Sequence, residues 1–286
     1  MTEADEHRGI GARGDRLVAE VARLDRATDV AWSVSVRDVD RGQQVAGLDP
    51  DRVLPIASVG KLLLLLEVAR RLDRGDLDGS VALRRHPEDE VADSGLWQHL
   101  TVSELTVDDL ALLIGAVSDD LATNVLLRHI GLSAVQELGE VLGLVSTRLL
   151  DRVRDLRTDA LPPTLALGCA QELSWLLAGL SRGTVVSPGA SARVRGWLAH
   201  GADLSMVAAP FGLDPLARGE TGRRLTLFNK TGTDPGTRAD VGVVTRAGHG
   251  LAYAALAHWE DGRVESRNAA LEGLHRLGAA LRDYAG

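Results

Sequence analysis

Ser58 and Lys61 stand three positions apart, directly before a run of leucines. On a helix, residues three apart share a face, so the serine hydroxyl would lie beside the lysine ammonium, with unpaired backbone N–H groups aimed at the same point. A hydroxyl becomes a good nucleophile when a neighbouring group takes its proton, and a lysine does this when burial and nearby positive charge lower its pKa. The pair predicts a serine nucleophile with an activating lysine. The alternative for Ser58 is an ordinary helix N-cap.

Two further motifs follow along the chain: a Ser-Asp-Asp motif that begins at Ser118 and a Lys-Thr-Gly motif that begins at Lys230. Each motif alone is weak, because such triplets arise by chance. Together and in this order they resemble the three motifs of class A β-lactamases and of the wider family of penicillin-binding D,D-peptidases. The resemblance covers nearly the whole chain, including Asn124 in the continuation of the second motif and Arg238 after the third.

The resemblance implies a role for each motif residue. Ser118 would relay a proton to the leaving group, and Lys230 with Thr231 would hold a substrate carboxylate. The backbone N–H of Thr233 would complete an oxyanion hole with that of Ser58. Alternatives from ordinary structure are an N-cap role for Ser118 and a solvated position at a strand end for Lys230.

Three other side chains have a binding role and a structural alternative. Arg238 falls where some class A enzymes place an arginine that assists carboxylate binding, which suits a bidentate guanidinium. An ion pair with Asp234 or Asp240 explains it equally well. The resemblance also puts Asn124 among the substrate-binding residues. Trp97 would form either a wall of the substrate cleft or part of the core.

The second motif departs from the family at Asp120, where class A enzymes have asparagine. An asparagine amide both donates and accepts hydrogen bonds, whereas an ionised aspartate only accepts. An ionised Asp120 would pair with Lys61 and keep it protonated, which makes the lysine a worse base. A protonated Asp120, neutralised by burial, would restore the donor. The sequence leaves both states open.

A second departure concerns release of the acyl group. Counting from Ser118 without gaps puts Arg154 where class A enzymes carry the glutamate that activates the deacylating water, and Thr158 where they carry an asparagine. Loss of a general base costs roughly 10² to 10⁴ in rate, so we expect a long-lived acyl-enzyme. The candidate replacement bases are Asp151, Asp155 and Asp159.

These observations predict a serine hydrolase that opens β-lactam rings through an acyl-enzyme on Ser58, with slow deacylation. The alternatives are an esterase or a D,D-peptidase on the same scaffold and, outside enzymes, a β-lactam-binding sensor or pseudo-enzyme. The expected partner is a small β-lactam or a related ester or amide, bound by a monomer without a cofactor.

The elements that position these residues follow from the hydrophobic pattern. Alternating residues predict a hairpin from Val30–Asp38 and Gln43–Leu48, and apolar stripes predict a helix at Asp15–Ala27 and another at Glu265–Tyr284. Helical periods fill the middle of the chain, and strands return near its end. The expected middle helices are Val59–Leu72, Val107–Val117, Asp120–Ile130, Ser133–Leu142, Ala166–Gly179 and Ser191–Ala199, and the expected late strands are Arg223–Asn229, Asp240–Arg246 and Leu251–His258.

Strands at both ends gain most by pairing with each other, which predicts an α/β domain wrapped around an inserted all-α domain. We expect a flexible tail over 1–15, a discontinuous α/β domain over 16–55 and 205–286, and a helical domain over 56–204, with the active site in the cleft between them. This agrees with the fold that the resemblance implies, a serine β-lactamase/D,D-peptidase-like fold with an antiparallel sheet flanked by helices.

Composition excludes several classes of function. The 286 residues carry a formal net charge of −8 without clustered basic residues, which argues against a nucleic-acid-binding surface. The single cysteine, Cys169, rules out an intramolecular disulfide. The histidines lack a metal-ligand spacing, so we expect no metal site. The polar N-terminus has no signal-peptide core and no stretch has the length of a membrane span, so we expect no membrane partner and either a cytoplasmic protein or a secreted or periplasmic one whose signal peptide has been removed.

Overall fold

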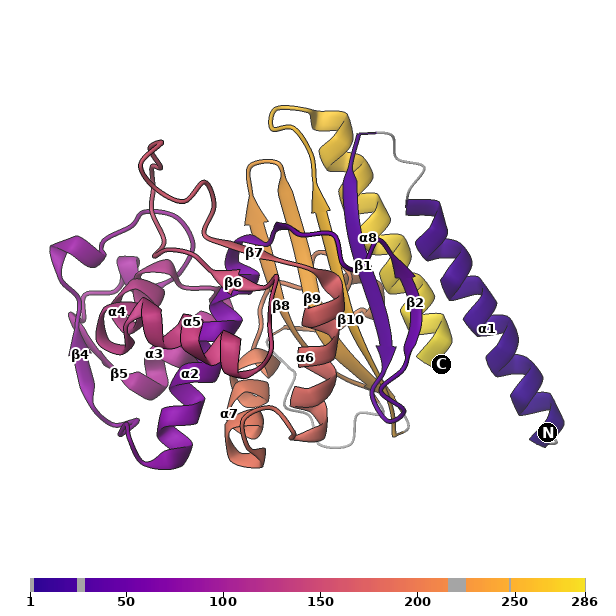
Figure 1. Cartoon of the computed structure of the whole chain (residues 1–286), viewed down its shortest axis with the longest axis horizontal. Helices are drawn as coiled ribbons and strands as arrows, with labels where there is room; N and C mark the ends of the chain where they lie inside the picture. Colours follow the sequence, from indigo (N-terminus) through magenta and orange to yellow (C-terminus); the bar gives the residue numbers. More distant parts are fainter. Residues whose placement is uncertain (1–2, 25–28, 216–224, 247, 286) are drawn as a thin grey trace.

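A five-stranded antiparallel sheet forms the centre of the molecule (Figure 1). The computed structural model describes residues 3–24, 29–215, 225–246 and 248–285. The strand order is β2-β1-β10-β9-β8, so a strand from the start of the chain pairs with one from its end, as in Ala31 opposite His258. The strands are β1 (Ala31–Asp38), β2 (Gln44–Leu48), β8 (Leu225–Asp234), β9 (Thr237–Arg246) and β10 (His249–His258).

Helices α1 (Glu3–Leu24) and α8 (Val264–Ala285) cover one face of this sheet (Figure 1). Side chains of β10 alternate between the two faces: Tyr253 packs with the core under α1 and α8, whereas Ala254 joins the core on the other side. Helix α1 begins at Glu3, well before the expected start at Asp15, so the range predicted as a tail is helical from residue 3 onward. Residues 25–28, where that predicted helix ended, lie outside the described residues.

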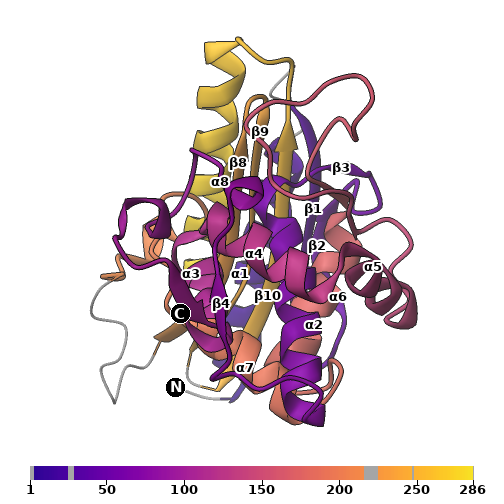
Figure 2. The same ribbon diagram turned by 90° about the vertical axis from the view of Figure 1, so that its left-hand side faces the viewer.

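The opposite face of the sheet carries the larger core, which continues into a group of helices (Figure 2). Its central element is α2 (Lys61–Arg74), whose leucines Leu62–Leu66 are all buried because other elements surround the helix. The helices packed around α2 are α3 (Val107–Val117), α4 (Asp120–Ile130), α5 (Leu132–Val141) and α7 (Pro188–Ala199), and α6 (Ala170–Arg182) packs against α7 and the sheet. Short strands and 3₁₀ turns connect them: β3 (Leu54–Pro55), β4 (Ala82–Arg84), β5 (Glu104–Thr106), β6 (Arg148–Leu149), β7 (Ala166–Gly168), η1 (Ala57–Gly60), η2 (Pro87–Asp89), η3 (Trp97–His99) and η4 (Ala209–Phe211).

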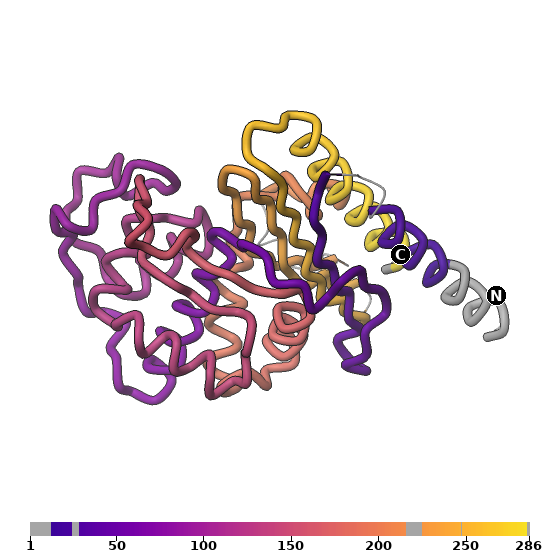
Figure 3. Tube along the Cα trace, turned by 45° about the horizontal axis from the view of Figure 1, so that its top comes forward, coloured from indigo at the N-terminus to yellow at the C-terminus, as the bar shows by residue number. Residues whose placement is uncertain are grey.

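The chain path agrees with the wrapped topology expected from the sequence: both chain ends belong to the sheet and its outer helices, and the middle forms the helical part (Figure 3). The first and last strands pair, and the predicted hairpin of β1 and β2 is confirmed. Helix α6 lies within the range expected for the helical domain yet packs on the sheet, where Ser174 Oγ and Ser35 Oγ are 2.8 Å apart. The proposed domain boundaries stay a prediction.

Two predicted elements differ from the structure. Residues 166–168, predicted as the start of a helix, form β7, which pairs with β3 and β6; helix α6 begins after the extended Cys169. The first late strand, predicted to end at Asn229, ends later than predicted, because β8 continues through the Lys-Thr-Gly motif to Asp234. No described helix is long and apolar enough to cross a membrane.

Candidate active site

Ser58 lies in the 3₁₀ turn η1, between the short strand β3 and helix α2. The cap of this turn is Ile56 and the cap of α2 is Gly60, neither with a side-chain hydrogen bond, so Ser58 does not act as an N-cap. Ala57, immediately before it, has a φ of 45°, in the left-handed region that costs energy for a residue with a side chain. The unfavourable backbone conformation therefore lies at Ala57, immediately before the candidate nucleophile.

The edge strand β8 packs directly against this turn. A Cβ atom added to Gly232 would lie 2.3 Å from the Ile56 carbonyl oxygen and 3.2 Å from the Ser58 nitrogen. Only glycine allows such an approach, which explains the glycine of the Lys-Thr-Gly motif. The close contact brings the residues after Gly232 next to the candidate nucleophile.

A cleft of about 370 Å³ lies between the helical part and β8. Five of the predicted site residues line it: Ser58, Ser118, Lys230, Thr231 and Thr233. The other lining residues are Ser94, Gly115, Ala116, Val117, Gly201, Ala202, Asp203 and Asn229. Residues from three motifs far apart in sequence thus meet at one surface.

Lys61 is fully buried behind this cleft. Its Nζ donates to the Ser118 carbonyl oxygen at 2.6 Å, to Ser118 Oγ at 3.2 Å and to the Asp120 carboxylate, with which it forms an ion pair. Three acceptors match the three N–H bonds of an ammonium. Burial lowers the pKa of Lys61, and the charge and hydrogen bond of Asp120 oppose that shift.

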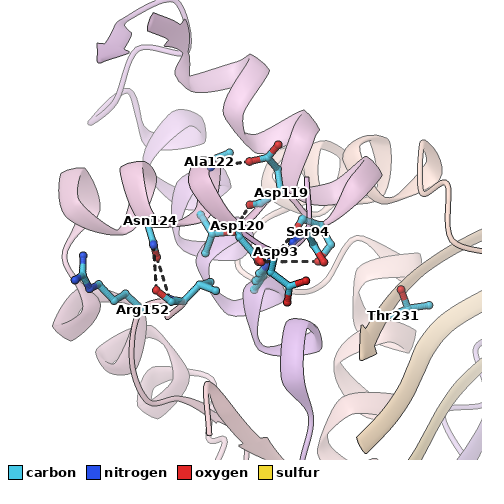
Figure 4. A network of polar contacts seen from close by, with 12 residues as sticks. Asp93, Ser94, Asp119, Asp120, Ala122, Asn124, Arg152 and Thr231 are labelled. Atoms are coloured by element: carbon cyan, nitrogen blue, oxygen red, sulfur yellow. Dashed lines mark hydrogen bonds and ion pairs between the residues drawn. The ribbon is translucent and has the colours of Figure 1, made fainter. Parts of the chain in front are cut away.

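The Asp120 carboxylate has a donor at each of its oxygens. Its Oδ1 faces the Lys61 ammonium. Its Oδ2 accepts from the Ser94 backbone N–H at 3.0 Å (Figure 4). Both carboxylate oxygens of Asp120 thus act as acceptors, one for the Lys61 side chain and one for the backbone of the segment that contains Ser94.

Ser118 links two lysines. It joins α3 to α4 with a φ of 58°, and its Oγ lies 3.2 Å from Lys61 Nζ and 2.9 Å from Lys230 Nζ. The N-cap of α4 is Asp119, whose side chain accepts from the Ala122 N–H, so the alternative role of Ser118 as this cap is wrong (Figure 4). The Ser118 hydroxyl is left free to contact the cleft and the two ammonium groups.

Lys230 is buried on β8, and the solvated position considered for it is excluded. Its Nζ donates to Ser118 Oγ and, at 2.9 Å, to the Thr231 carbonyl oxygen. Burial first and then the nearby charge of Lys61 lower the pKa of Lys230 to about 7, against the opposing charges of Asp203, Asp120 and Asp240. A lysine in this state carries its charge on only part of the molecules at neutral pH.

Asp203 is a cleft residue that sequence reasoning missed. It lies after α7, is exposed to the cleft and belongs to no recognisable motif. Burial raises the pKa of its carboxyl, but hydrogen bonds from Ser205 and Thr231 and the charge of Lys230 outweigh this and hold that pKa below its ordinary value. Asp203 therefore presents a negative charge beside Lys230 and Thr231.

Arg238 and Trp97 do not line the cleft. Arg238 borders a neighbouring cavity of about 390 Å³, with its guanidinium 5.8 Å from the Trp259 ring; it donates to the backbone carbonyls of Asp234 and Thr237 and makes no ion pair with either candidate carboxylate. Trp97 is a core residue, because it is fully buried and its Nε1 donates to the Val102 carbonyl.

The assignment of Asn124 to substrate binding is corrected by its contacts. Its amide donates to the carbonyls of Asp89 and Val153 and accepts from the Val153 N–H, so both ends of the side chain are occupied. Asn124 is buried and holds the loop that follows β6. Its role is to position that loop.

The same loop carries the candidate deacylation bases. Asp151 is bound by Arg154 and Arg157, which lower its pKa despite burial. Asp155 accepts from the Ala92 N–H at 2.9 Å, and Asp159 is exposed. Among the described residues that line the cleft, none comes from 150–165.

No group of three or more His, Cys, Asp or Glu side chains within the described ranges could hold a metal ion. What the cleft brings together is a serine hydroxyl, a second serine between two buried lysines, and one exposed carboxylate.

Comparison with known proteins places this arrangement in a family. The chain is 26% identical over 275 residues to a β-lactamase of Rhodobacter capsulatus, covering 93% of this chain and 88% of that protein. It is 28% identical over 144 residues to the β-lactamase regulatory protein BlaB of Streptomyces cacaoi, covering 50% of this chain and 46% of BlaB.

Solved structures share the fold. A β-lactamase of Sphaerobacter thermophilus DSM 20745 superposes with a TM-score of 0.79 at 21% identity, covering 93% of this chain and 95% of that one. A mutant of PBP-A, solved as its acyl-enzyme complex with penicillin-G, gives a TM-score of 0.77 at 18% identity, with 94% and 96% covered. The model of the beta-lactamase enzyme family matches residues 16–285, and this chain belongs to that family as a serine β-lactamase-like hydrolase.

Proposed function

We propose that this protein opens β-lactam rings through an acyl-enzyme on Ser58 and that the acyl-enzyme is released slowly. The observation that carries the proposal is the position of Ser118 Oγ between the Lys61 and Lys230 ammonium groups, in the cleft that Ser58 also lines. A hydroxyl in this place can pass protons between a lysine and a reacting group.

Acylation requires one bond to form and one to break. Ser58 Oγ adds to the lactam carbonyl carbon, the C–N bond opens, and the proton of Ser58 reaches the leaving nitrogen through Lys61 and Ser118. The backbone N–H groups of Ser58 and Thr233 would stabilise the oxyanion, which is supported by the close packing of β8 on η1 at Gly232. Lys230 and Thr231 would contact the substrate on the leaving-group side.

The contacts in the loop after β6 support slow release of the acyl group from Ser58. Arg154, at the position where the resemblance expects a glutamate, is engaged with Asp151, and Asp155 is engaged with the Ala92 backbone. Neither carboxylate borders the cleft. Without a base to activate water, the ester on Ser58 should persist.

A second candidate is a β-lactam-binding sensor, which would use the same acylation and no turnover. It is favoured by the similarity to BlaB, a protein named as a regulator of β-lactamase. The two candidates differ in the fate of the acyl group, since a sensor would never recover free Ser58. An esterase or a D,D-peptidase would share the acylation step and differ in the acyl donor.

Intact-mass spectrometry tests the proposal. The protein is mixed with penicillin G or nitrocefin and sampled from seconds to hours, and a Ser58 adduct with the full mass of the ligand is expected to accumulate and decay slowly. The Ser58→Ala variant should form no adduct and show no turnover, whereas the exposed Ser103→Ala variant should behave as the wild type. Rapid turnover without an adduct would contradict slow release, and activity that survives Ser58→Ala would overturn the nucleophile.

A further inference from the structure

Asp240 is a buried carboxylate that the proposed acylation does not use. It lies on β9 directly opposite Thr231 of β8 and is fully buried. Its Oδ2 accepts from the Val207 N–H at 2.9 Å, and its Oδ1 accepts from Asn229 Nδ2 and from the Tyr253 hydroxyl, each at 3.1 Å. The three donors belong to β8, to β10 and to the segment after α7, so Asp240 ties that segment to the sheet.

Asn229 connects Asp240 to the wall of the cleft. Its Nδ2 also donates to the Asp203 carbonyl oxygen at 3.3 Å, and the wall segment, residues 201–203, lines the cleft. The Asn229 side chain is buried, and its Oδ1 has no hydrogen-bond partner within the described part of the chain. The amide thus uses its nitrogen twice and leaves a buried acceptor empty, which is a costly state for a polar atom.

The Asp240 carboxyl exchanges its proton near neutral pH. Burial raises its pKa from 3.8 to about 7, its three hydrogen-bond donors oppose that shift, and the charge of Asp203 adds to it. Lys230 is the cation on the neighbouring strand, and the charge of Asp240 raises the pKa of Lys230. Both charge states of Asp240 are therefore populated at neutral pH.

The empty acceptor of Asn229 suits the neutral state of Asp240. A protonated carboxyl carries an O–H donor that needs an acceptor. The oxygen and the nitrogen of an amide have nearly the same shape, so a half turn of the side chain exchanges their places. In Asn229 this turn would bring Oδ1 to the Asp240 proton and would take the N–H away from the Asp203 carbonyl.

We propose that Asn229 is a positioning residue that couples the protonation of Asp240 to the wall segment. With ionised Asp240 the amide nitrogen holds the Asp203 carbonyl; with neutral Asp240 the amide is turned and that carbonyl is released. The proton comes from solvent, and only its own bond to Asp240 is made or broken. The inference rests on the proposed acylation of Ser58, which takes place in the cleft that the wall segment lines. Acylation is faster when the wall is held, because reacting groups then keep their geometry.

Nuclear magnetic resonance of the Asn229 side chain tests the turn of the amide directly. The ¹H–¹⁵N signals of its NH₂ group are assigned by their loss in Asn229→Leu and are followed from pH 5 to 9. In the wild type they should shift with a midpoint near pH 7, where Asp240 changes its charge. In Asp240→Asn they should stay constant over this range.

The rate constant for formation of the Ser58 adduct with penicillin G is measured over the same range and should rise with the same midpoint. Tyr253→Phe removes a hydrogen bond that lowers the pKa of Asp240, so both midpoints should move together to higher pH, by up to about one unit. A step that belonged to Lys230 would move the other way, because a neutral Asp240 no longer raises the pKa of Lys230. Asn268→Leu, at an exposed position of α8, is the control and should keep both wild-type midpoints.

Asn229→Leu keeps Asp240 but has no amide to turn, so its acylation rate should lose this step. If Asn229→Leu does not fold, the joint shift of the two midpoints in Tyr253→Phe decides. Asn229 signals that stay constant in the wild type would overturn the inference, and so would a rate step that does not follow Tyr253→Phe to higher pH. Absence of a Ser58 adduct at every pH would overturn the proposed function instead, and the resonance titration would still decide the turn of the amide.

Discussion

The Lys61 ammonium and the Asp120 carboxylate form an ion pair with both side chains buried, beside the Ser118 hydroxyl. The pairing keeps all three N–H bonds of Lys61 occupied by Ser118 and Asp120. A lysine in this state has no lone pair with which to take a proton from Ser58. The pair therefore limits how readily Lys61 acts as a base.

Replacement of Asp120 by asparagine should release this limit. The charge of Asp120 raises the pKa of Lys61, so Asp120→Asn lowers that pKa further and increases the fraction of neutral lysine. One pKa unit corresponds to about a tenfold gain in acylation rate on the acid side of the pH profile. The variant should also lose about 1–3 kcal/mol of unfolding free energy, because either Lys61 or the Ser94 N–H loses its acceptor.

The measurement for Asp120→Asn is the acylation rate from pH 5 to 9. Asp93→Asn is the control, because the exposed Asp93 also raises the pKa of Lys61 but has a smaller effect than Asp120. In Asp93→Asn, the low-pH part of the curve of acylation rate against pH should shift less than it does in Asp120→Asn. If this part of the curve does not shift in either variant, Lys61 does not take part in the proton transfer.

Gly232→Ala should slow acylation and also lower the thermal midpoint, because the added methyl group meets backbone atoms that cannot move aside cheaply. The added methyl group would collide with the Ile56 carbonyl and push β8 away from the turn that carries Ser58. A displacement of about 1 Å at reacting groups can cost about 100-fold in rate. The rate of Ser58 adduct formation and the thermal midpoint are measured together.

Gly139→Ala serves as the matched control, since a Cβ atom at this helical position of α5 meets no neighbour within 4 Å. It should keep the wild-type rate and gain slightly in stability, because alanine favours the helix. Equal rates in both variants would show that contact between β8 and η1 does not set the nucleophile's geometry.

Asp155→Asn should leave the deacylation rate nearly unchanged. The Asp155 carboxylate accepts from the Ala92 N–H, and asparagine can keep that hydrogen bond. We expect a change of less than about twofold, whereas loss of a true general base would slow release by about 10² to 10⁴. The decay of the penicillin adduct is followed by mass spectrometry, with Asp159→Asn as a control for charge in the same loop.

Asp240 should make stability depend on pH. Burial raises its pKa from 3.8 to about 7, despite hydrogen bonds from Asn229, Tyr253 and the Val207 N–H and in concert with the charge of Asp203. Between pH 3.8 and about pH 7, Asp240 keeps its proton in the folded protein and has lost it in the unfolded chain. This contribution to stability is complete below about pH 4 and is lost as the pH rises through about 7, by a few kcal/mol in order of magnitude.

Urea unfolding of the wild type and Asp240→Asn at pH 5 and pH 8 measures this effect. The variant lacks the titrating group, so its unfolding free energy should fall less between the two pH values than that of the wild type. A constant offset between the two proteins at both pH values would mean that Asp240 is ionised in the fold throughout the range.

Local sequence signals were sufficient for many elements. Apolar periodicity placed α3 and α4 at their observed bounds, and the turn after Asp38 placed the first hairpin. The sequence did not identify the N-cap of α4, because serine and aspartate both cap helices. The cap is Asp119 rather than Ser118, because the Asp119 side chain accepts from the Ala122 N–H.

The types of the reacting groups and their order are properties of the sequence: Ser58, Lys61, Ser118 and Lys230 were identified from motif spacing, and their catalytic roles stay predictions. Their electrostatic state was decided by tertiary structure, because a pKa depends on burial and on charges brought in from other elements. Asp203 has no motif and reaches the cleft only through the path of the chain after α7. The contact of Asp120 with the Ser94 N–H and the orientation of Asn124 toward a loop likewise depend on backbone groups contributed by distant segments, which no local pattern encodes.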